Sequence, residues 1–149
     1  MLHILCREGG QMMEVNYDGK ADADDVLMEI QKVFLAQFDT IKKIAEEGPC
    51  VIVGRCADYV LKGNPNVLNF FVMGNITEKK KRILERYDIE KNKVEDFIRK
   101  TDKRRAHYYN YYTDMKWGEA KNYDLCINSS KTGIQGAVDL MKSYIQIKE

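Results

Sequence analysis

The sequence has no long hydrophobic run. Its longest apolar segments are CVIVG at residues 50–54 and FFVMG at residues 70–74, whereas a membrane-spanning helix needs about 20 apolar residues. The N-terminus also lacks the cationic segment followed by an apolar one that a secretory signal requires. These absences predict a cytoplasmic protein with no membrane partner.

Cysteine and proline are scarce. The four cysteines, Cys6, Cys50, Cys56 and Cys126, form no CxxC pair and have no histidine at ligand spacing. This argues against zinc and thioredoxin-like sites, so we expect reduced thiols that pack as small hydrophobic side chains, and no metal site. The two prolines and ten glycines do not cluster into a linker, and 149 residues suit one domain. We therefore expect a single domain over residues 1–149.

The sequence also lacks a strong net charge, but its charges are unevenly distributed. The formal charge is +1, while residues 1–50 carry net −5 and residues 76–112 carry net +5. A general duplex-binding protein is more often basic overall. The asymmetry instead favours a localised anionic ligand, and it makes nucleic acid an unlikely partner.

Hydrophobic periodicity predicts alternating helices and strands. Apolar residues recur at three- and four-residue steps over residues 22–47, as in an amphipathic helix. Continuous apolar runs rich in β-branched residues are typical of strands buried on both faces of a parallel sheet. Strands are expected at residues 50–54, 66–74 and 123–130, and further helices at 58–62, 76–87, 91–112 and 134–145. MLHILC at residues 1–6 could add a strand, but residues 1–21 otherwise fit no element well. The pattern predicts an α/β fold, a parallel sheet with flanking helices.

Basic residues follow or flank the predicted strands. Arg55 follows the strand at 50–54, at the edge where parallel sheets bind ligands. Its position alone fits a solvent-exposed arginine at a helix start equally well. On a helical wheel for residues 94–112, Arg105 shares an inward stripe with Tyr108 and Tyr112, so it must meet a carboxylate or an anionic ligand. Lys100, Lys103 and Arg104 lie on other faces, and Tyr109 and Tyr111 could stack on bases.

A second basic helix carries Arg82 and Arg86. Asn75 is a plausible N-cap for this helix, with Glu78 three residues later. With Arg55, Arg104 and Arg105, these arginines suit an enzyme that transfers a phosphoryl group, because such catalysis depends on positioning and charge neutralisation.

Three segments resemble the cytidylate kinase-like family of P-loop nucleoside monophosphate kinases. They are GPCVIVGRCADYVL, RKTDKRRAHYYNYYTDMKWG and NYDLCINSSKTGIQGAVDLM, within about residues 40–149. The resemblance implies a P-loop kinase-like fold that transfers the ATP γ-phosphoryl group to CMP or dCMP with Mg²⁺. It implies that Arg55 contacts the monophosphate and that Arg104 and Arg105 surround the transferring group. It also implies that Asp102 positions these arginines, with Arg82 and Arg86 assisting in substrate binding.

The sequence departs from this family at its N-terminal side. None of the ten glycines begins GxxxxGK[ST] or GxGxxG, the loops that cradle donor phosphates. LCREGG at residues 5–10 could be a shortened remnant, with Gly9 and Gly10 binding the nucleotide cofactor. We therefore expect an incomplete N-terminal side and weak or lost catalysis.

Two alternatives to an active kinase stay open. One is a non-catalytic nucleotide-binding domain, or a partner domain whose sheet edge is completed by a second copy in a homo-oligomer. The other is a small protein that binds single-stranded nucleic acid through residues 99–112.

Overall fold

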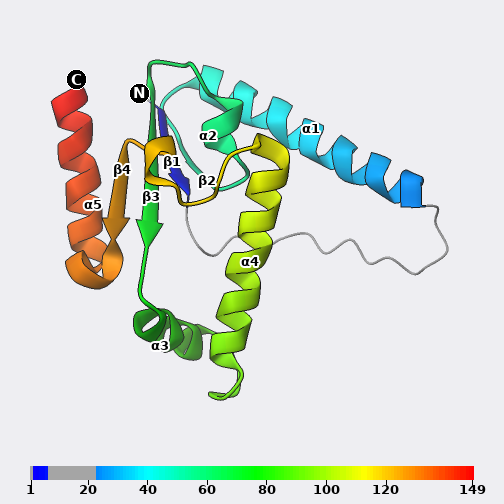
Figure 1. Cartoon of the computed structure of the whole chain (residues 1–149). Coiled ribbons are helices and arrows are strands. Elements are labelled where there is room, and N and C mark those ends of the chain that lie inside the picture. The colour runs from blue at the N-terminus through cyan, green and yellow to red at the C-terminus, as the bar shows by residue number, and fades with distance from the viewer. Residues whose placement is uncertain (1, 7–22) are drawn as a thin grey trace.

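A four-stranded parallel sheet stands between helices in this computed structural model, which describes residues 2–6 and 23–149 (Figure 1). Its strands run in the order β2-β1-β3-β4, and every pairing is parallel. They are β1 Leu2–Cys6, β2 Val51–Val53, β3 Val67–Met73 and β4 Leu125–Asn128. The predicted α/β class, with a parallel sheet and flanking helices, is confirmed.

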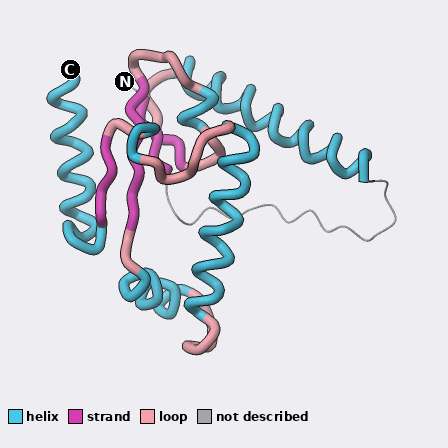
Figure 2. The backbone as a smooth tube through the Cα atoms, viewed as in Figure 1, coloured by secondary structure: helices cyan, strands magenta, loops and turns pink. Residues whose placement is uncertain are grey.

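The helices lie where the periodicity predicts them (Figure 2). They are α1 Ala23–Glu47, α2 Ala57–Val60, α3 Ile76–Arg86, α4 Val94–Thr113 and α5 Ser129–Lys148, with a 3₁₀ turn at Ala120–Asn122. Helix α5 begins before the predicted residue 134 because the Asn128 side chain accepts a hydrogen bond from the Ser130 N–H and caps it. Gly133, with φ 70°, then interrupts the helix.

Helices cover both faces of the sheet. Alternate strand residues point to opposite faces, so Phe71 packs on one side with Ile41 of α1 and Ala57 of α2. On the other side, Phe70 meets Tyr144 of α5 edge to face, with ring centroids 5.9 Å apart. The core therefore lies on both sides of β3, which has a neighbouring strand at each edge.

The prediction that residues 50–54 are buried on both faces is wrong. In β2, Ile52 joins the core, but Val51 and Val53 are 57% and 44% exposed. The strand lies at the sheet edge, and α5 packs on β3 and β4 instead. A continuous apolar run does not distinguish an edge strand from a central one.

The segment MLHILC does contribute a strand, since β1 pairs with both β2 and β3. Gly9 and Gly10 lie outside the described residues, so their predicted role stays a prediction.

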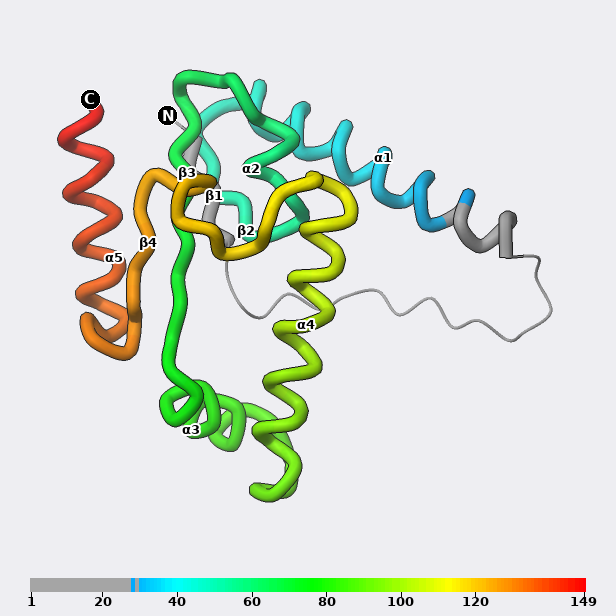
Figure 3. The backbone as a smooth tube through the Cα atoms, viewed as in Figure 1, coloured from blue at the N-terminus to red at the C-terminus, as the bar shows by residue number. Residues whose placement is uncertain are grey.

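All four strands end at one edge of the sheet, and beyond the end of β3 lie α3 and the first turns of α4 (Figure 3). Within the described ranges, no helix combines the length and apolar character needed to cross a membrane.

The described cysteines are free thiols, as predicted. Cys56 is buried, and Cys50 and Cys126 are half-buried. Burial raises the pKa of Cys56 to about 12, with the charge of Asp58 acting in the same direction. A thiol held protonated in this way is a poor nucleophile.

Candidate functional site

Asp102 joins α3 to α4 beyond the end of β3. One of its carboxylate oxygens lies 2.8 Å from Nζ of Lys79, and the other lies 3.0 Å from Nη1 of Arg105. The three side chains are only 15–26% exposed. We call Lys79, Asp102 and Arg105 the Asp102 cluster. Two cations share one carboxylate, so the cluster keeps a net positive charge in a partly desolvated place.

The local sequence explains why α3 starts beside this cluster. The Asn75 side chain accepts a hydrogen bond from the Glu78 N–H at 2.9 Å, as predicted for a helix cap. The Asn75 N–H donates to Oγ of Ser130, and Oγ of Ser129 donates to the Met73 carbonyl. These bonds fasten the end of β3 to the start of α5.

Gly74 lets an arginine approach the end of β3. A Cβ atom at this position would lie 3.1 Å from Nη2 of Arg82 and 3.3 Å from Oγ of Ser130. The guanidinium of Arg82 therefore lies against the backbone at the strand end. Gly74 also lines a cavity of about 400 Å³, together with Lys79, Arg99 and Asp102.

Ion pairs hold the first turns of α4 against α3. Glu95 pairs with Lys80 of α3 and, at 2.8 Å, with Arg99 one turn later on α4. Hydrogen bonds from Lys80 and Arg99 lower the pKa of Glu95 to about 2. The ion pairs of Glu95 thus form a second link between α3 and α4, in addition to the Asp102 cluster.

Arg55 lies in a left-handed turn directly after β2. Gly54, Arg55 and Cys56 have φ values of 73°, 59° and 55°, a conformation that non-glycine residues rarely adopt and that often marks functional sites. Burial, with Cys56 and Tyr112 nearby, raises the pKa of Tyr108 to about 12, while the charge and hydrogen bond of Arg55 act in the opposite direction. Arg55 therefore reaches α4 through Tyr108.

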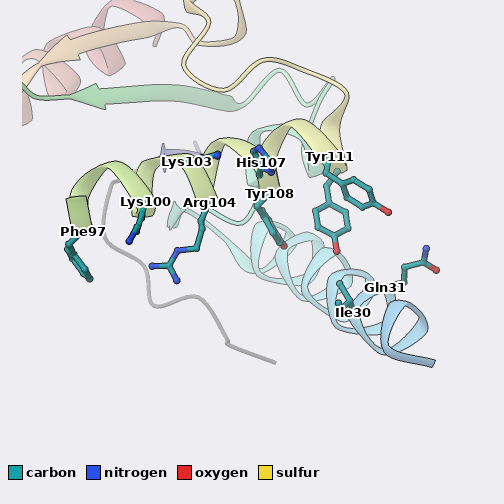
Figure 4. Close-up of a pocket in the computed structure, with 10 residues that line it drawn as sticks. Ile30, Gln31, Phe97, Lys100, Lys103, Arg104, His107, Tyr108 and Tyr111 are labelled. Carbon is teal, nitrogen blue, oxygen red and sulfur yellow. The ribbon is translucent and has the colours of Figure 1, made fainter. Parts of the chain in front are cut away.

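A larger cavity, of about 760 Å³, opens between α1 and α4 (Figure 4). We call it the α1–α4 groove. Its basic lining residues are Lys100, Lys103 and Arg104, and His107 lies on the same wall. Its aromatic ones are Phe97, Tyr108, Tyr111 and Tyr112, and α1 contributes Ile30 and Gln31.

Most of the predicted arginines lie at one of two places, the Asp102 cluster or the α1–α4 groove. Arg105 belongs to the Asp102 cluster, and Arg82 lies nearby at Gly74. Arg104 lines the groove because consecutive helical side chains point about 100° apart. Arg55 lies beside Tyr108 at the groove. Arg86 is exposed at the end of α3 and has no ion pair within the described residues.

Lys79 is a site residue that the sequence does not single out. It is one of three consecutive lysines, Lys79 to Lys81, in a basic helix. The available signal was its position in the first turn after the Asn75 cap, which places it near the end of β3. Its carboxylate partner is 23 residues away in the sequence, so no local pattern reveals the pair.

The prediction that Tyr109 could stack on bases is wrong. Tyr109 is 4% exposed, and its hydroxyl donates a hydrogen bond to Asp58 at 2.6 Å. Helix α4 buries the stripe that runs through Val94, Ile98, Tyr109 and Thr113. Tyr108 and Tyr112, predicted to face inward, are only half-buried.

The described residues do not fit a magnesium site built by the protein. Among them, no three His, Cys, Asp or Glu side chains form a group that could hold a metal ion. Both oxygens of Asp102 are engaged by cations, and the buried Asp58 accepts from Tyr109. With both of its oxygens occupied by cations, Asp102 is a poor ligand for Mg²⁺.

Comparisons with known proteins agree with the fold and the basic segments. Residues 8–131 match the model of the cytidylate kinase-like family, which extends the likeness toward the N-terminus beyond the three segments noted in the sequence. The crystal structure of an uncharacterized protein from Eubacterium ventriosum ATCC 27560 is similar at a TM-score of 0.75. It shares 36% sequence identity and covers 82% of this chain and 79% of its own. No curated protein matches. Since the family model spans most of the sequence, this chain belongs to the cytidylate kinase-like family.

Proposed function

We propose that this protein binds a cytidine monophosphate, CMP or dCMP, with its phosphate against the Asp102 cluster. The observation that carries the proposal is the pairing of Lys79 and Arg105 with one carboxylate beyond the end of β3. Parallel sheets bind their ligands at this edge. Lys79 and Asp102 of the cluster line a cavity in which a phosphate can be partly removed from water.

Arg105 is suited to hold that phosphate. Its guanidinium has five N–H donors in a planar fork, and the contact with Asp102 fixes its direction through Nη1. The remaining donors can bind two phosphate oxygens side by side. Asp102 is then a positioning residue, and Arg82 at Gly74 supplies a further positive charge from α3.

We propose further that phosphoryl transfer from ATP to this monophosphate is weak or lost. The 149 residues contain no GxxxxGK[ST] motif. Donor phosphates therefore lack the usual backbone cradle. Reduced thiols suit the cytoplasm, where ATP and free nucleoside monophosphates are available.

The alternatives have less support. Tyr109 is buried, so the basic helix offers fewer aromatic rings to single-stranded nucleic acid than the sequence suggested. Association through the exposed edge strand β2 stays a prediction, and light scattering that finds a strict monomer would exclude it.

A coupled ADP-release assay with ATP and CMP, dCMP, UMP or AMP tests the proposed function. We expect measurable binding of cytidine monophosphates by calorimetry but little ADP release. Rapid ADP release by the native chain that is abolished in Arg55→Ala would contradict the proposal that phosphoryl transfer is weak or lost. Absence of CMP and dCMP binding would contradict the proposed function itself.

A further inference from the structure

The two edges of the sheet differ in how much apolar surface they leave exposed. At one edge, β4 has half-buried Leu125 and Cys126 and buried Ile127. At the other edge, Val51 and Val53 of β2 are 57% and 44% exposed. Parallel sheets normally have both faces covered, so β2 is the edge that departs from this pattern.

The pairing register identifies the face of β2 that is left uncovered. Leu5 is the partner of both Val53 and Phe70, and residues paired in this way lie on the same face of a sheet. Val53 therefore shares the face on which Phe70 meets Tyr144 of α5. Helix α5 packs on β3 and β4, and it leaves the valines of β2 exposed to solvent.

Strand β2 also lacks the charged residues and prolines that commonly prevent pairing at a sheet edge. Its three residues, Val51, Ile52 and Val53, are all β-branched. Ile44 of α1, 40% exposed, adds apolar surface beside the start of the strand, where its carbonyl accepts a hydrogen bond from Sγ of Cys50 at 3.9 Å. Within the described part of the chain, β2 pairs only with β1, so its outer edge offers main-chain N–H and C=O groups.

The strand is complementary to itself in antiparallel pairing. A two-fold axis through Ile52, perpendicular to the sheet, would pair Val51 of each copy with Val53 of the other. Residues directly opposite in an antiparallel pair lie on one face, so the valines of both copies meet on the face that α5 occupies. This register pairs every residue of β2, which no shifted register does.

The charges that flank β2 favour the same arrangement. Exposed Glu46 and Glu47 end α1 just before the strand, and Arg55 follows it. Antiparallel pairing brings the acidic start of one strand toward the basic end of the other, and the two-fold axis repeats this contact. A parallel arrangement would instead bring like charges together.

We propose that β2 is an interaction surface for a second copy of this chain, with the two strands antiparallel and the two four-stranded sheets joined as one. The inference goes beyond the proposed function, since it involves no nucleotide. It assigns an edge, a register and a direction to the homo-oligomer that the sequence left open. Because only three residues of each copy pair, the interface is small and the dimer weak, with a dissociation constant on the order of 10–100 μM.

Sedimentation velocity of the full chain over about 5–500 μM tests this surface. We expect the sedimentation coefficient to rise with concentration as dimers form. Val53→Lys should abolish the rise, because a charge at a sheet edge disfavours pairing. Ile147→Lys, at an 81% exposed position on α5, is the matched control and should leave the dimer intact. Circular dichroism checks that each variant is folded.

Charge reversal tests the direction of the pairing. Glu47→Lys should weaken the dimer several-fold, and its combination with Arg55→Glu should restore it, because the contact is then reversed and not lost. A double variant no better than Glu47→Lys would overturn the antiparallel arrangement.

Three other results would overturn the interaction surface itself. They are a chain that stays monomeric at the highest concentration, a dimer that Val53→Lys leaves intact, and an equal loss in Ile147→Lys. None of these readouts depends on CMP binding, so the proposed function stands or fails separately.

Discussion

Tyr109 of α4 donates a 2.6 Å hydrogen bond to Oδ2 of Asp58 in α2, and both residues are buried. The other oxygen of Asp58 has no hydrogen-bond partner among the described residues. Burial raises the pKa of this carboxyl, against the hydrogen bond from Tyr109, which lowers it. The bond thus fastens α4 to α2, close to Arg55 and the groove.

Tyr109→Phe should destabilise the protein. The substitution leaves Oδ2 of Asp58 buried without its donor, which costs about 1–3 kcal/mol in free energy of unfolding. Urea denaturation monitored by circular dichroism measures the change. Tyr111→Phe, at an exposed position on the same helix, is the control and should stay within about 0.5 kcal/mol. Equal effects of the two substitutions would contradict a structural role for the Tyr109–Asp58 bond.

Glu95 should make the contact between α3 and α4 sensitive to acid. Its pKa is lowered from 4.5 to about 2 in the folded protein. A lowered folded-state pKa contributes stability that is present above pH 4.5 and lost as the pH falls toward about 2. Glu95→Gln should therefore lower the melting temperature at pH 6 and leave it unchanged near pH 2.

Thermal unfolding across this pH range is the measurement, with Glu85→Gln as an exposed control on α3. A difference between Glu95→Gln and the native chain that persists unchanged to pH 2 would contradict the assignment of the ion pairs.

Phe34→Ala should loosen α1 from α4. The Phe34 ring is stacked on Tyr112 and lies 6.4 Å from Tyr108. Loss of this half-buried ring should lower the free energy of unfolding by about 1–3 kcal/mol. Leu35→Ala, at the neighbouring exposed position, serves as control in the same denaturation experiment. If Leu35→Ala costs as much as Phe34→Ala, the aromatic stack does not hold the two helices together.

Local sequence patterns predicted the helices and strands well because each of these elements has one dominant period of hydrophobic residues. The helical repeat over residues 22–47 became α1, and the Asn75 cap formed as expected. The wheel also indicated that Arg105 needs an anionic partner, and Asp102 one turn earlier provides it. These features depend on residues that lie near one another in the chain.

The features that the sequence did not predict depend on contacts between segments that are distant in the chain. Tyr109 is buried instead of Tyr108 because its partner is Asp58, 51 residues away. Val51 and Val53 are exposed because β2 lies at the sheet edge, which its apolar sequence does not show. Arg104 and Arg105 separate into two sites because α4 meets α1 on one face and α3 on another.

The central claim is that the Asp102 cluster holds a cytidine monophosphate. Calorimetric titration of CMP into the native chain, Arg105→Ala and Lys142→Ala, an exposed lysine on α5, tests it most directly, with circular dichroism to confirm that each variant is folded. We predict saturable binding to the native chain, a loss of about tenfold to a hundredfold for Arg105→Ala because a charge-assisted contact is removed, and no change for Lys142→Ala. Equal affinities of the native chain and Arg105→Ala, or no saturable binding to the native chain, would contradict the account.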